Sequence, residues 1–138
     1  MLELTTPAYL AMVGHAYDGL PDEACGLLGG RAVPPRVDRF VPCRNADASS
    51  RTYSIGPDCW QAADDQLDQS GLEVIGVMHS HTHTHAYPSP TDVEAADNPL
   101  LVGWHYVIVS LRDPEPELHS YRIESGNIIE EPVVLLNQ

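Results

Sequence analysis

Basic residues are scarce in this chain of 138 residues, which has seven Lys and Arg against 20 Asp and Glu and a formal net charge of −13 at pH 7. A nucleic-acid-binding domain needs a basic face to neutralise phosphates. An anionic membrane surface likewise attracts basic rather than acidic proteins. The composition therefore predicts neither a nucleic-acid partner nor a membrane partner.

Cysteines and long apolar runs are also few. Cys25, Cys43 and Cys59 are odd in number, widely spaced and without a C-x-x-C pair, so they indicate neither a disulfide framework nor a cysteine metal site. We expect Cys25 and Cys59 to be packing residues. The apolar run 8–14 is too short for a membrane span, and the first residues lack the basic region of a secretory signal. We therefore expect a cytoplasmic protein.

The length fits a single domain over residues 1–138, which can bury about two thirds of its unfolded surface around one core. Thr6 and Pro7 are expected to open a first helix as N-cap and N1, with Leu10, Val13 and Tyr17 on its core face. Two further helices are expected at 57–70 and 90–98. Strands are expected at 2–4 (an edge strand), 23–30, 36–43, 51–55, 72–78, 104–111, 117–123 and 127–136. This order predicts an α/β sandwich with a curved mixed sheet flanked by helices. The oligomeric state is left open, with a homodimer as one option.

The segment 76–92 carries the strongest signal for chemistry, because His79, His81 and Asp92 stand in the order H-x-H-x10-D. The two histidines end the apolar strand, so residues i and i+2 project from one face and their imidazoles converge. Asp92 follows a Pro-Ser-Pro turn that leads into a helix, from which a carboxylate can return to the same point. Two nitrogens, one oxygen and water make a catalytic type of zinc site.

The same residues have simpler interpretations. Ser89 and an acid at the third helical position also form a helix N-terminus, so Asp92 is a cap, a ligand or both. His83 and His85 continue the alternation, which leaves open whether they too bind metal, as in a storage tract that holds several ions. An H-x-H pair on a TIM barrel is excluded, because that fold needs about 200 residues or more.

These residues resemble the JAMM (MPN+) metalloprotease motif, E…H-S-H-x7-S-x2-D, with Glu23 as its upstream acid. The resemblance covers nearly the whole chain and includes the later S-L-R-D-P and S-Y-R-I segments within 110–123. It is closest to a bacterial branch with H-S-H-T in place of the H-S-H-P common in deubiquitinases. It implies the cytidine-deaminase-like fold of this family, Zn²⁺ as cofactor, Glu23 as general base and Ser89 as a donor to the oxyanion.

The resemblance also implies a substrate. Compact members of this branch release cysteine from the C-terminal Gly-Gly of a ubiquitin-like sulfur-carrier protein, and 138 residues leave no room for the insertions that grip two ubiquitins. Two alternatives stay open. One is a deubiquitinase-like isopeptidase, and the other is a non-catalytic MPN scaffold, although such scaffolds typically lose metal ligands that are all present here. Asn45 matches an asparagine common in the family, which either orders the substrate segment or caps a loop.

Overall fold

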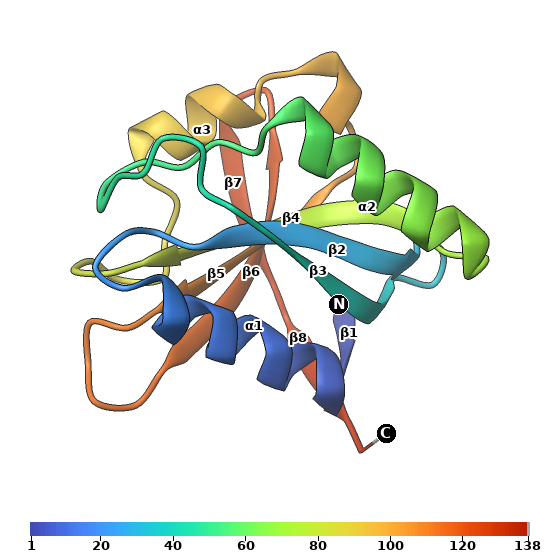
Figure 1. Ribbon diagram of the computed structural model, residues 1–138, viewed down its shortest axis with the longest axis horizontal. Helices are drawn as coiled ribbons and strands as arrows, with labels where there is room; N and C mark the ends of the chain where they lie inside the picture. The colour runs from blue at the N-terminus through green and yellow to red at the C-terminus, as the bar shows by residue number, and fades with distance from the viewer. Residues whose placement is uncertain (138) are drawn as a thin grey trace.

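The computed structural model describes residues 1–137, and in this range eight strands form one mixed sheet with helices on both faces (Figure 1). The strand order is β7-β6-β5-β4-β2-β3-β1-β8. Helix α1 covers one face, while α2 and α3 lie over the other (Figure 1). The predicted α/β sandwich is therefore confirmed. The elements are β1 (Leu2–Thr5), α1 (Thr6–Gly19), β2 (Cys25–Arg31), β3 (Arg36–Cys43), α2 (Pro57–Gln69), β4 (Glu73–His81), α3 (Pro90–Ala96), the 3-10 helix η1 (Pro99–Leu101), β5 (His105–Ser110), β6 (Glu117–Glu124), β7 (Asn127–Glu131) and β8 (Val133–Leu136).

Strand β4 lies at the centre of the sheet, antiparallel to β2 and parallel to β5. Its neighbour β2 is rich in glycine because other groups approach its backbone closely. A Cβ atom on Gly26 would lie 2.4 Å from the ring of Phe40, and one on Gly29 would lie 2.2 Å from the side chain of Leu67. The sequence-based prediction of a closely approached central strand is confirmed.

The two faces of β4 serve different cores, since alternate side chains point to opposite faces. Met78 packs in the cluster that contains Met12 of α1. Val77 belongs to the cluster on the other face, with Ala96 of α3. Between Val77 and the end of β4 the alternation is regular, so His79 and His81 lie on the same face as Val77, toward α2 and α3. This alternation decides on which side the site is built.

Four expectations about secondary structure are wrong. Strand β1 lies inside the sheet, because it pairs with β3 on one side and with β8 on the other. The segment expected as a strand at 51–55 contributes only an isolated bridge from Ile55 to Asn45. The strand expected at 127–136 is two strands, β7 and β8, on opposite edges of the sheet. Pro132 separates them, since a residue without an N–H interrupts a ladder.

The fourth error concerns helix α1. Its N-cap is Thr5, whose hydroxyl accepts a hydrogen bond from the Ala8 amide at 3.3 Å. Leu10 and Tyr17 are exposed, whereas Ala8, Met12 and Ala16 are buried. The inner stripe of the helix therefore consists of two alanines and one methionine, and not of the larger residues expected.

The structure also overturns the expectation of no disulfide. Cys43 at the end of β3 and Cys59 in the first turn of α2 are bonded, with an S–S distance of 2.02 Å, and Cys25 is free and buried. Cys59 is therefore a cross-link and not a packing residue. The bond closes the connection between β3 and α2. Among the described residues, no helix is long and apolar enough to cross a membrane.

Candidate active site

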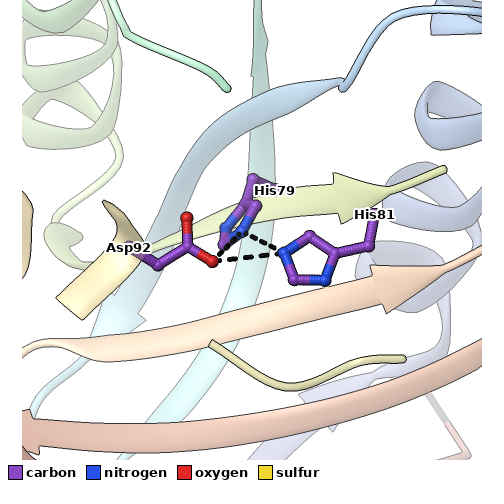
Figure 2. Close-up of side chains that lie close together, drawn as sticks. All are labelled: His79, His81 and Asp92. Atoms are coloured by element: carbon purple, nitrogen blue, oxygen red, sulfur yellow. Dashed lines mark hydrogen bonds and ion pairs between the residues drawn. The ribbon is translucent and has the colours of Figure 1, made fainter. Parts of the chain in front are cut away.

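His79, His81 and Asp92 converge on one point above the sheet (Figure 2). The Nε2 atoms of the two histidines are 3.1 Å apart. Oδ2 of Asp92 lies 3.1 Å from Nε2 of His79 and 3.2 Å from Nε2 of His81. The structure thus brings together all three residues that the sequence predicted as ligands.

The start of α3 aims Asp92 at this point. Ser89 is the N-cap, and its Oγ accepts a hydrogen bond from the Asp92 amide at 3.1 Å. In return, the Ser89 amide donates to Oδ2 of Asp92 at 2.8 Å, which completes a capping box. The same oxygen faces both imidazoles. The cap and the site are therefore one arrangement, as the sequence allowed.

The two imidazoles are oriented in different ways. Nδ1 of His81 lies 2.7 Å from the carbonyl oxygen of His85, so Nδ1 carries a proton and, in the neutral ring, Nε2 keeps its lone pair. The ring of His79 stacks on Tyr53, with centroids 4.4 Å apart and an angle of 18° between the planes. Nδ1 of His79 is buried and has no hydrogen-bond partner within residues 1–137. The Nδ1 side of this second ring is therefore held by packing and not by a hydrogen bond.

The charge states of the three side chains follow from burial and from their mutual contacts. Burial lowers the pKa of His79, so its ring is neutral. Burial also disfavours a charged His81, but hydrogen bonds to Asp92 and to the His85 carbonyl outweigh it and raise the pKa of His81. For Asp92, burial acts to raise the pKa, yet the bonds with both imidazoles hold it well below the usual value. Asp92 is therefore an ionised acceptor.

The donor set and its spacing fit zinc. Two imidazole nitrogens and one carboxylate oxygen are a combination found in catalytic zinc sites, which keep a fourth position open. Ligands of a regular tetrahedron with bonds of about 2.0–2.1 Å are about 3.3 Å apart. The three separations of 3.1, 3.1 and 3.2 Å are close to that value. The residues present therefore match the group that the sequence predicted.

Glu23 and Ser89 line a cavity of about 480 Å³ next to this cluster, together with His81 and residues of two loops. Glu23 is buried, and its Oε1 has no hydrogen-bond partner in the described part of the chain. Burial raises the pKa of Glu23 to about 7. A carboxylate of this kind can gain and lose a proton near neutral pH, beside the point where the three predicted ligands meet.

Three positioning residues were missed or left undecided by the sequence. Ser80, between the two histidines, is fully buried. Its Oγ accepts a hydrogen bond from the Ala24 amide at 2.7 Å, which fixes the backbone next to Glu23. Tyr53 covers one imidazole. Asn45 donates through Nδ2 to the carbonyl oxygens of Glu23 at 3.0 Å and Thr52 at 2.9 Å. It therefore orders the loop. No spacing in the sequence signals these contacts.

The other histidines of the tract lie outside the metal cluster. Nδ1 of His83 is 2.7 Å from the hydroxyl of Thr82, and Nε2 of His85 is 2.6 Å from Arg112. Within residues 1–137, the group able to hold a metal consists of His79, His81 and Asp92. The tract is thus divided into a convergent pair and two exposed residues.

The remaining histidines have structural contacts. His15 of α1 lies 3.0 Å from the carbonyl oxygen of Cys25. His105 of β5 is buried 2.6 Å from Glu131 of β7, and the half-buried His119 lies 2.8 Å from Glu130. None of the three belongs to the metal cluster described above.

Sequence comparison relates this chain to a known family and to characterised proteins. Residues 5–124 match the family model described as prokaryotic homologs of the JAB domain. A protein of Mycobacterium tuberculosis named CysO-cysteine peptidase is 43% identical over 133 residues, which cover 93% of this chain and 86% of that protein. A Haloferax volcanii protein named desampylase is 31% identical over 114 residues, covering 79% of this chain and 80% of that protein.

Solved structures show the same fold. The solution structure of a Desulfitobacterium hafniense protein is 35% identical and has a TM-score of 0.91, with 100% of this chain and 94% of that chain covered. The crystal structure of a JAB1/MPN domain protein from Archaeoglobus fulgidus has a TM-score of 0.64 at 17% identity. The match covers 99% of this chain and 98% of that chain. The second likeness concerns the fold alone, and it matches the fold expected from the sequence motif.

Proposed function

We propose that this chain, which belongs to the prokaryotic JAB domain family, is a zinc metallopeptidase. Its substrate is a ubiquitin-like sulfur-carrier protein that ends in Gly-Gly with a cysteine added. The enzyme cleaves the amide bond after the Gly-Gly and releases the cysteine. The observation that carries this proposal is the convergence of His79, His81 and Asp92 beside a cavity lined by Glu23 and Ser89. The similarity to a CysO-cysteine peptidase over 93% of the chain supports the choice of substrate.

His79, His81 and Asp92 would hold the zinc ion through Nε2, Nε2 and Oδ2. A zinc ion held in this way polarises a carbonyl group and lowers the pKa of water toward about 7. Glu23 accepts the proton of the attacking water at its unpartnered Oε1 and then delivers it to the departing amine. A pKa of about 7, raised by burial, suits a group that must first take and then give this proton.

Ser89 is placed to bind the carbonyl oxygen of the scissile bond. Its Oγ accepts the amide of Asp92, so the hydroxyl proton stays free to donate into the cavity. A donor of this kind gains strength as negative charge develops on the carbonyl oxygen, and its removal typically lowers the rate by about 10²–10³. Ser89 therefore has two roles, as helix cap and as oxyanion donor.

The proposed substrate suits a compact chain. An extended diglycine tail can pair with the edge of a strand or lie in a narrow channel, because it binds through main-chain hydrogen bonds. A single amino acid as leaving group needs little surface beyond the scissile bond. Selectivity then comes from the folded body of the carrier, whose binding energy positions the scissile bond, so short peptides are expected to be poor substrates.

The test is mass spectrometry of a ubiquitin-like carrier that ends in Gly-Gly-Cys, incubated with the zinc-loaded protein. We expect the loss of one cysteine residue with the wild type. Glu23→Gln is the matched control: it should retain zinc, because no ligand changes, and lose nearly all turnover. Near wild-type turnover in Glu23→Gln would leave the reaction without its base.

The metal assignment has its own test. His79→Ala should lose zinc, while a His83→Ala/His85→Ala double variant should keep one zinc per chain, since neither ring belongs to the cluster. Elemental analysis after dialysis measures both. Zinc lost from the double variant and retained by His79→Ala would contradict the ligand set.

A second candidate is a deubiquitinase-like isopeptidase, which the similarity to the protein named desampylase favours. Such an enzyme cleaves a bond to a lysine side chain. If the cysteine adduct survives while lysine-linked ubiquitin-like conjugates are cut at the same enzyme concentration, this second function replaces the first.

A further inference from the structure

The connection between β3 and α2 brings one arginine to the catalytic cavity. Ser50 and Arg51 of this connection line the same cavity as Glu23 and Ser89. Among the described lining residues, Arg51 is the one with a permanent positive charge. A cation at this place is notable in a chain with seven Lys and Arg and a net charge of −13.

Hydrogen bonds to both polar groups of the peptide between Ser50 and Arg51 hold this backbone in place. Ser49 accepts the Arg51 amide through Oγ at 3.0 Å. The carbonyl oxygen of Ser50 accepts the hydroxyl of Thr82 at 3.2 Å, which joins the loop to the residue after His81. The backbone of Arg51 is thus fixed at the cavity wall even though its side chain is exposed.

The charge balance of the cavity favours a role for this cation. Glu23 and Asp92 face the reaction centre, and Asp47 lies close enough to contribute to the raised pKa of Glu23. None of the ion pairs found in residues 1–137 involves Arg51. The carboxylates repel an anionic substrate group, and among the side chains that line the cavity Arg51 is the cation able to offset that repulsion.

The chemistry of the proposed substrate supplies such an anion. In a carrier that ends in a single added amino acid, the scissile nitrogen and the free α-carboxylate are bonded to the same Cα. Their nitrogen and carboxyl carbon are therefore about 2.5 Å apart. Whatever residue recognises that carboxylate must line the catalytic cavity. A lysine joined through its side chain and within a protein carries no free carboxylate at this distance.

We propose that Arg51 binds the α-carboxylate of the departing amino acid and selects adducts of a single C-terminal residue over lysine-linked conjugates. The guanidinium offers a planar pair of N–H donors that matches a carboxylate. This inference rests on the proposed function, because it concerns the leaving group of that reaction. It makes Arg51 a specificity-determining residue.

The test compares two substrates that differ in one group. A ubiquitin-like carrier ending in Gly-Gly-Cys is prepared as the free acid and as the C-terminal carboxamide, and kcat/KM is measured for each with the zinc-loaded protein. The wild type should prefer the free acid by about 10–100-fold, the range expected for hydrogen bonds between charged groups. Arg51→Gln should bring the ratio of the two kcat/KM values close to one, and Arg51→Lys should retain part of the preference.

The matched control is Arg31→Gln, which removes the same charge at the far end of β2 from Glu23 and should leave the ratio unchanged. The ratio is informative because a merely structural loss in Arg51→Gln would slow both substrates equally. In the inactive Glu23→Gln background, calorimetry should show tighter binding of the acid than of the amide, and Arg51→Gln should abolish the difference.

Failure of the inference and failure of the function give different results. Equal cleavage of acid and amide by the wild type, or an unchanged preference in Arg51→Gln, overturns the role of Arg51 and leaves the peptidase assignment intact. Cleavage of neither adduct overturns the proposed function and the inference with it.

Discussion

Reduction of the bond between Cys43 and Cys59 should lower the stability of this protein substantially. The two residues are 16 positions apart. Closing a loop of about 15 residues lowers the conformational entropy of the unfolded chain, which stabilises the folded state by about 3 kcal/mol. The entropy of unfolding is about 2.1 cal/mol/K per residue near 60 °C, or about 290 cal/mol/K for the 138 residues of this chain. A loss of about 3 kcal/mol then lowers Tm by about 10 °C.

The assay is thermal unfolding with and without a phosphine reductant, followed by circular dichroism. A Cys43→Ser/Cys59→Ser double variant is the control, because it should melt at the lower temperature and be insensitive to the reductant. Thiol titration of the unfolded wild type should find one free cysteine, Cys25. Three free thiols, or a shift below about 3 °C on reduction, would refute this account of the connection between β3 and α2.

Two further predictions concern the site and the sheet. Ser89→Ala should retain zinc and lower kcat by on the order of 10² or more, because the lost donor acts mainly in the transition state; unchanged turnover would remove it from the mechanism. Burial acts to raise the pKa of Glu131, but the hydrogen bonds from His105 and Ser120 lower it from 4.5. This contribution to stability is therefore present above about pH 4.5 and is lost as the pH falls through the lowered pKa. Glu131→Gln should lower the free energy of unfolding by about 1.5–3 kcal/mol at pH 7, and this free energy should then fall less steeply with pH than in the wild type. Urea unfolding from pH 7 to 3 measures both effects. A variant as stable as the wild type would contradict this prediction.

The sequence by itself predicted the sandwich and the candidate ligands because both depend on local patterns. The two-residue period of a strand places His79 and His81 on one face. The Ser-Pro turn before Asp92 fixes the start of α3 and the direction of its carboxylate. The same local information identified the closely approached glycines of β2. The roles of Glu23 and Ser89 were predicted from the family motif, and the structure places both at one cavity.

Only the tertiary structure decided which distant segments meet. Cys43 and Cys59 are far apart in sequence, and the order of the strands and the packing of α2 bring them into bonding distance. The division of residues 127–136 between opposite edges of the sheet likewise depends on how the sheet curves, which no local period records. Tyr53 and Arg51 reach the site because a loop without regular structure is held by a hydrogen bond within the loop and by another from Thr82, the residue after β4. Periodicity reports which face of an element is buried, whereas the partners that cover that face are set by long-range packing.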